Sequence, residues 1–81
     1  MRRDQIYGKL RNIFLSVLSR ESIELLPETS ASDVEEWDSL SHVRLILAVE
    51  NEFEIRFATA ELTRFENVGQ LVDMIDEKLS V

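Results

Sequence analysis

The sequence predicts an all-α fold: a small four-helix bundle of three main helices and one short helix, with a long loop between helices 1 and 2. Apolar residues recur at intervals of three and four along three stretches, which is the spacing of one helical face. Two of these stretches begin after residues that cap helices well, Asp38 and Asn67. The alternating segment 53–57 has no second strand with which to pair.

The first helix is expected from about Asp4 to Ser19. Six apolar residues fall on one of its faces, while Lys9 and Arg11 lie outside that face. We interpret the apolar face as part of the core. Its residues are Ile6, Leu10, Ile13, Phe14, Val17 and Leu18.

Residues 21–38 form a long connection to the next helix. Eighteen residues exceed the length of most loops in compact domains, which indicates either a function or docking onto the core. Pro27 prevents the chain from continuing as a helix. We expect a short helical turn at residues 32–36. Three apolar residues are expected to pin the loop to the core: Ile23, Leu25 and Leu26.

Asp38, Ser39 and Leu40 open the second helix. The carboxylate of Asp38 can accept an amide hydrogen of the first turn, so Ser39 takes the first helical position with its hydroxyl toward solvent. A helix N-terminus carries partial positive charge and unpaired N–H groups, which favour a phosphate. Leu40 begins the apolar face. A serine in this position is well placed to be modified.

The second helix is expected from Ser39 to about Glu52, with an apolar face broad enough to pack on more than one neighbour. The predicted core therefore includes Leu47. The segment 53–57 follows as an extended link. The residues of the broad face are Leu40, Val43, Leu45, Ile46, Leu47, Ala48, Val49 and Phe53.

The short helix is expected within Thr59–Phe65, anchored by Leu62 and Phe65. Asn67 then caps the last helix, and Gln70 three residues later completes the pattern of a capping box. The apolar face of this helix consists of Val68, Leu71, Val72, Ile75 and Leu79.

Length and composition predict one small domain over residues 1–81, monomeric and cytoplasmic. The chain has 81 residues and no cysteine, which fits a reducing compartment. No unbroken apolar run follows the first four residues, so we expect no signal peptide, and no stretch is long enough to span a membrane.

The net charge of −7 is distributed unevenly. Residues 1–20 contain five of the nine basic residues and only one acid, whereas the other fifteen acids all follow. An acidic surface repels nucleic acid and favours basic protein partners. The basic first helix lacks the interleaved aromatic residues of a nucleic-acid site, so we predict no nucleic-acid binding.

Catalytic and metal sites are not favoured by the residues present. His42, the only histidine, lies three residues after Ser39, but a working pair also needs an orienting group and an oxyanion hole. We therefore interpret His42 as a solvated surface residue and predict no catalytic residue. Glu35, Glu36 and Asp38 form only a loose acidic cluster, so no metal site is predicted.

The order of these elements resembles the acyl carrier proteins. Asp38-Ser39-Leu40 matches the family's Asp-Ser-Leu motif, and the link 53–57 resembles its Phe-x-x-x-Ile segment, with Phe57 in place of Ile. Residues 67–71 resemble the Thr-Val-Gly-Asp-Leu start of the last helix, and residues 27–30 resemble a Pro-Asp-Thr-Ser loop. Further similar positions in the second helix are Val43, Leu45, Ile46, Ala48, Glu50, Glu52 and Phe53.

The resemblance implies a non-enzymatic carrier with a covalent 4′-phosphopantetheine arm on Ser39, flanked by Asp38 and Leu40. Such an arm, taken from coenzyme A by a phosphopantetheinyl transferase, holds acyl or aminoacyl groups as thioesters. Loading and condensing enzymes with basic docking patches would be the partners, attracted by acids such as Glu35, Glu36, Glu50 and Glu52. The residues expected to contact these partners are Trp37, His42, Val43, Arg44 and Glu50.

Two departures from the family pattern concern the choice of pathway. Glu36-Trp37 replaces the usual Gly-Leu or Gly-Met before the aspartate, and Trp37 is expected to pack under the loop or to line the partner surface. Ser41, His42 and Arg44 stand where housekeeping carriers of fatty acid synthesis often have acids. We therefore predict a carrier for polyketide, peptide or other specialised synthesis. The alternative is an acidic helical protein-interaction domain without a prosthetic group.

Overall fold

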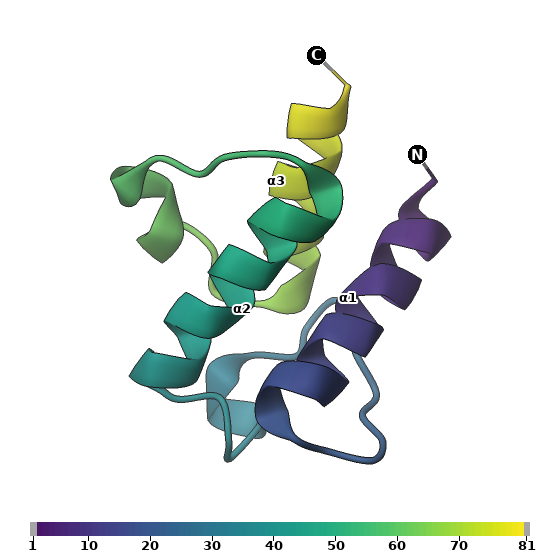
Figure 1. The fold of residues 1–81 in the computed structure, drawn as a ribbon, viewed down its shortest axis with the longest axis vertical. Coiled ribbons are helices and arrows are strands. Elements are labelled where there is room, and N and C mark those ends of the chain that lie inside the picture. The colour runs from purple at the N-terminus through teal and green to yellow at the C-terminus, as the bar shows by residue number, and fades with distance from the viewer. Residues whose placement is uncertain (1, 81) are drawn as a thin grey trace.

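The computed structural model describes residues 2–80, and its elements confirm the predicted all-α fold. Three α-helices run from Arg3–Leu18 (α1), Ser39–Phe53 (α2) and Val68–Leu79 (α3). The expected short helix is a 3₁₀ turn, η2, over Thr59–Thr63, and a second 3₁₀ turn, η1, spans Ala31–Asp33. Neither a strand nor a helix able to cross a membrane occurs within residues 2–80. Figure 1 shows α2 crossing in front of α3, with α1 at their side.

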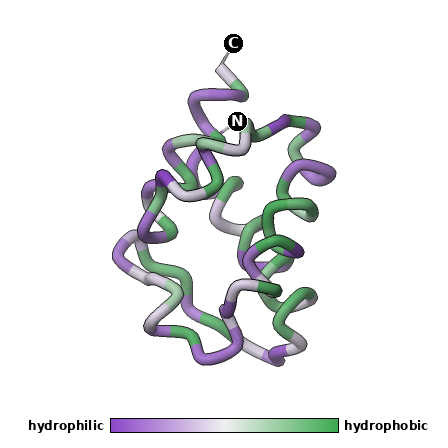
Figure 2. Tube along the Cα trace, turned by 90° about the vertical axis from the view of Figure 1, so that its left-hand side faces the viewer, coloured by the Kyte–Doolittle hydropathy of each residue, from purple (hydrophilic) through white to green (hydrophobic). Residues whose placement is uncertain are grey.

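α1 packs against both of the other main helices. Its buried side chains face the interior, and Phe14, Ile6 and Leu10 are fully enclosed. By contrast, α2 and α3 approach each other closely at few points. Figure 2 shows hydrophobic and hydrophilic residues alternating along the helices, as amphipathic packing requires. The core therefore forms around α1.

The long loop is docked on the start of α3. The amide of Val68 donates to the carbonyl of Thr29 at 2.8 Å, and the amide of Gly69 donates to that of Pro27 at 2.8 Å. These bonds satisfy two of the amides that a helix start leaves unpaired. A Cβ on Gly69 would lie 3.0 Å from the Pro27 carbonyl oxygen, so any other residue would push the loop away by a few tenths of an ångström.

The loop's apolar anchors were predicted correctly in part. Ile23 and Leu25 pack against the core as half-buried side chains, which confirms the prediction for both. Leu26 is 41% exposed, so the prediction is wrong for this residue. The loop instead buries Val34 and Trp37 near its end.

The broad apolar face of α2 is divided between core and surface. Leu45, Ile46, Val49 and Phe53 are buried. Leu40, Val43 and Leu47 are 64%, 54% and 55% exposed, so the predicted core role of Leu47 is wrong, and Leu40 does not begin a buried face. The spacing of apolar residues alone could not separate the buried side from the exposed side. Apolar residues occupy more of the circumference of α2 than the neighbouring elements cover.

The caps of α3 follow the prediction with one difference. Asn67 accepts a hydrogen bond from the Gln70 amide at 2.9 Å, as expected of an N-cap residue. The Gln70 side chain, however, accepts from the amide of Glu66 at 2.6 Å instead of returning to Asn67. The extended link before η2 is held by Glu50, whose carboxylate accepts from the Phe57 amide at 2.8 Å.

Burial predicts opposite outcomes for two large-to-small substitutions. Ile75→Ala should lower the free energy of unfolding by about 2–5 kcal/mol, because Ile75 is fully buried and a cavity would remain. Leu47→Ala should change it by about 0.5 kcal/mol or less, since most of this side chain is in water. Urea unfolding followed by circular dichroism measures both values. A similar loss for the two variants would contradict the packing of α2.

Candidate functional site

Ser39 lies at the first position of α2 with its side chain exposed. It also lines a surface cavity of about 450 Å³, shared with Ala31, Trp37, Asp38 and His42. The first amides of a helix have no partners inside it and carry partial positive charge. The predicted placement of Ser39 is therefore confirmed, and a phosphate ester at its hydroxyl would meet a favourable helix end.

Asp38 caps α2 as predicted. Its Oδ1 accepts a hydrogen bond from the Ser41 amide at 2.9 Å, and its own carbonyl accepts from the His42 amide at 2.9 Å. The hydrogen bond from the Ser41 amide holds the pKa of the Asp38 carboxyl below its ordinary value. The carboxylate is therefore charged at neutral pH, and its role at the site is to fix the helix start.

The segment before Ser39 is tied to the first turn of α2. The Ser41 hydroxyl donates to the carbonyl of Glu36 at 2.8 Å. The Trp37 ring is buried, with 5% exposed, and meets the Phe14 ring of α1 edge-on at 5.1 Å. Trp37 thus packs under the loop, which confirms one of the two predicted placements, and it also lines the cavity beside Ser39.

His42 is half-buried against aromatic side chains and is not the solvated residue that we predicted. Its ring lies nearly parallel to that of Trp37, with centroids 6.2 Å apart, and stacks on that of Phe65 at 5.2 Å. The Trp37 indole N–H donates to His42 Nδ1 at 3.1 Å, so Nε2 carries the proton and donates to the Leu62 carbonyl at 3.2 Å.

The remaining predicted contact residues lie on α2 in different settings. Val43 and Arg44 are exposed one turn after Ser39. Glu50 is half-buried and bonded to the Phe57 amide, so its carboxylate helps to hold the link after α2. Ser41, Leu62 and Phe65 were missed as parts of the site. Trp37 and His42 lie on either side of a helix N-cap, and this spacing could have predicted the hydrogen bond between them. Nothing in the sequence predicts that the Leu62 carbonyl bonds His42.

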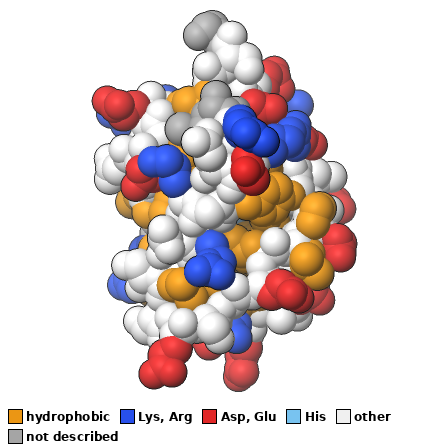
Figure 3. All heavy atoms as spheres, turned by 90° about the vertical axis from the view of Figure 1, so that its right-hand side faces the viewer, with side chains coloured by type: hydrophobic (Ala, Val, Ile, Leu, Met, Phe, Trp, Pro, Cys, Tyr) orange, Lys and Arg blue, Asp and Glu red, His pale blue; other side chains and the backbone are white. Residues whose placement is uncertain are grey.

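Ion pairs neutralise much of the basic charge of α1 and the residues beside it. Figure 3 shows acidic and basic side chains interspersed on the face that includes α1. Two of the acids that we expected to attract partners, Glu36 and Glu52, are engaged in this way. Arg44 takes part in none of the ion pairs found within residues 2–80. These pairs are Arg2–Asp4, Arg3–Asp73, Arg3–Asp76, Lys9–Glu52, Arg20–Glu36 and Lys78–Glu61.

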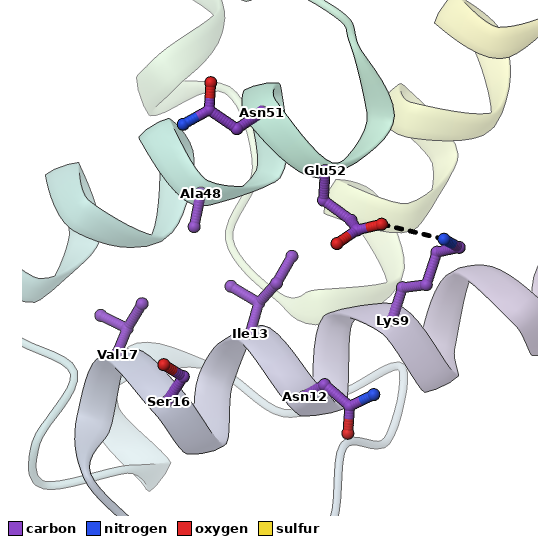
Figure 4. A pocket seen from close by; sticks show the side chains of 8 residues that line it. All are labelled: Lys9, Asn12, Ile13, Ser16, Val17, Ala48, Asn51 and Glu52. Atoms are coloured by element: carbon purple, nitrogen blue, oxygen red, sulfur yellow. Dashed lines mark hydrogen bonds and ion pairs between the residues drawn. The ribbon is translucent and has the colours of Figure 1, made fainter.

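A second cavity, of about 550 Å³, lies between α1 and α2 and away from Ser39. Figure 4 shows Ile13, Val17 and Ala48 at this place, with the Lys9–Glu52 ion pair at one end. The pair spans 2.9 Å and links the two helices. The described part of the chain contains no group of three or more acidic or histidine side chains suited to a metal ion.

Known proteins share this arrangement. A family model described as "Phosphopantetheine attachment site" matches residues 8–75. The chain belongs to the acyl carrier protein family. Acyl carrier proteins of Petrotoga mobilis and Chlorobium phaeobacteroides are 31% and 32% identical to it; the alignments cover 100% and 96% of this chain and 95% and 100% of theirs. The solution structure of the holo acyl carrier protein from Geobacter metallireducens is 46% identical, with a TM-score of 0.84 over 90% of this chain and 84% of that one.

Membership of the family confirms several predictions together. This acyl carrier protein has the predicted helical fold, and its function is to tether acyl intermediates on 4′-phosphopantetheine and to act with partner enzymes. The exposed serine, the capped helix start and the adjacent cavity fit such an arm, and the arm supplies the thiol that forms thioesters.

The cap of α2 makes the stability of the protein depend on pH in acid. Because the folded pKa of Asp38 lies below its ordinary 3.8, the carboxylate stabilises the protein above that pH. The contribution is lost as the pH falls through the folded value. Asp38→Asn keeps a good N-cap residue that does not titrate.

We therefore expect native protein to lose more stability than Asp38→Asn between about pH 5 and about pH 2.5. Thermal unfolding of both proteins across this range, followed by circular dichroism, measures the difference. Parallel curves would show that the carboxylate contributes nothing beyond an uncharged cap.

Proposed function

We propose that Ser39 is the residue that carries the 4′-phosphopantetheine arm. The observation that carries this proposal is the placement of an exposed serine hydroxyl at the capped start of α2 beside a cavity. Asp38 would hold the helix end in place, and Leu40 would flank the ester on the solvent side. In the transfer, the hydroxyl of Ser39 gains the phosphopantetheinyl group of coenzyme A, and 3′,5′-ADP leaves with loss of the hydroxyl proton.

We also propose that the chain is a single carrier domain without catalytic activity of its own. Support comes from His42, because both ring nitrogens are bonded to Trp37 and Leu62 and neither is directed to Ser39 as a base. Chemistry on the bound group is then the work of partners: a phosphopantetheinyl transferase and enzymes that load or condense acyl or aminoacyl groups. A monomer in the cytoplasm that binds no nucleic acid fits this role.

The attachment site can be tested by intact-mass spectrometry. After incubation with coenzyme A, magnesium and a broad-specificity phosphopantetheinyl transferase, native protein should gain one phosphopantetheinyl group. Ser39→Ala should gain none, because the accepting hydroxyl is gone. Ser16→Ala, at an exposed serine of α1, is the matched control and should still gain one.

Thermal unfolding separates the chemical role of Ser39 from a structural one. The midpoint of Ser39→Ala should equal that of native protein, since the hydroxyl is exposed. No mass gain on the native chain, or a gain that persists in Ser39→Ala, would overturn the assignment.

The pathway is proposed to be a specialised one, on the basis of charge on α2. Arg44 lies among the exposed side chains of Leu40, Val43 and Leu47, and the first turn of α2 contains no acid. An enzyme with a basic docking patch would meet this cation, and like charges reduce both affinity and the rate of encounter.

Arg44→Glu should therefore improve loading by the malonyl transferase of housekeeping fatty acid synthesis. The improvement should be largest at low ionic strength, because salt screens exposed charges. His42 is left unchanged, since a glutamate there would break the ring stack. Arg44→Gln is the neutral control and should give an intermediate rate. Equal loading of all three proteins across a salt series would show that this charge does not select the partner.

A further inference from the structure

His42 lines two cavities. One is the Ser39 cavity of about 450 Å³, which also includes Trp37 and Ala31. The other, of about 190 Å³, lies between α2 and the segment with η2, and we call it the α2–η2 cavity. Apolar side chains such as Ile46, Phe57 and Leu62 line most of the α2–η2 cavity. His42 is the residue common to both linings.

The His42 ring is fixed in this position by its contacts. Phe65 stacks on the ring with centroids 5.2 Å apart, and the two ring nitrogens bond Trp37 Nε1 and the Leu62 carbonyl. Turning the ring aside would therefore break both hydrogen bonds and leave polar groups unpaired at a half-buried place. The same bond to Leu62 holds η2 against α2, so the ring fixes the width of the α2–η2 cavity as well.

We propose that His42 is a specificity-determining residue that keeps an acyl group carried on Ser39 out of the α2–η2 cavity. The inference rests on attachment of the arm at Ser39. An apolar chain near Ser39 would gain by entering the nearest apolar space. The fixed ring blocks the direct path from the Ser39 cavity, and the acyl group remains beside Trp37, where a partner enzyme can reach its thioester.

The first test measures how well the thioester is sheltered. Acetyl- and octanoyl-coenzyme A are used with the transferase to load native protein, His42→Ala and, as matched control, Arg44→Ala. Cleavage of each thioester by hydroxylamine is followed by intact mass, and each rate is divided by that of the corresponding free acyl-coenzyme A.

Native protein and Arg44→Ala should give similar relative rates for the acetyl and octanoyl groups. In His42→Ala the two cavities join, and the octanoyl thioester should be cleaved about tenfold more slowly, the factor expected from burying roughly two CH₂ groups. The inference would be overturned if hydroxylamine cleaved the octanoyl thioester at the same relative rate in native protein and in His42→Ala. This includes the case in which neither protein protects the thioester.

A second measurement needs no substitution at His42 and so does not depend on the folding of that variant. Nuclear Overhauser effects from a ¹³C-labelled octanoyl group on native protein should reach the Trp37 ring and not the methyl groups of Leu62. Contacts with Leu62 in native protein would overturn the inference while leaving attachment at Ser39 intact. Failure of any group to load onto Ser39 would instead overturn the proposed function, and this inference with it.

Discussion

The buried indole of Trp37 is the contact on which the arrangement around Ser39 depends. Its edge-on packing against Phe14 joins the end of the long loop to α1, and its N–H bond joins the same residue to His42 on α2. The segment from Glu36 to Ser41 is therefore held on both sides of the helix cap. An N-cap alone fixes only the backbone of the first turn, whereas the packed ring also fixes the direction from which the loop enters. The serine thus sits on a rigid support even though it is exposed.

Charge on the surface is organised less by the composition of each helix than by pairing between helices. The basic residues of α1 look available in the sequence, but Arg3 is paired with acids of α3 and Lys9 with Glu52 of α2. Such exposed pairs contribute little to stability. Their main effect is to neutralise charges that a partner would otherwise encounter. Arg44 takes part in no such pair within residues 2–80, so its charge contributes more to the electrostatic potential of this surface.

α2 has two functions that require opposite surfaces. One side buries Leu45, Ile46 and Val49 in the core, and the other exposes Leu40, Val43 and Leu47 near the end of the helix that begins with Ser39. Exposing three large apolar residues contributes nothing to the folding of a small domain, whose core is limited by its size. Contiguous exposed apolar residues next to a functional group are typical of a surface that a partner covers. The apolar content of α2 therefore exceeds what its packing in the core requires.

The sequence by itself determined the three helices, both caps, the exposed position of Ser39 and the family, because helical periodicity and capping depend on residues close together in the chain. Only the tertiary structure decided which side of α2 is buried and where Trp37 and His42 lie. Leu47 has the spacing of a core residue, yet no neighbouring element covers it. His42 has the spacing of a surface residue, yet Phe65 and Leu62 enclose it from a segment twenty residues away. Local patterns specify which face a residue occupies, but burial depends on what other parts of the chain pack against that face.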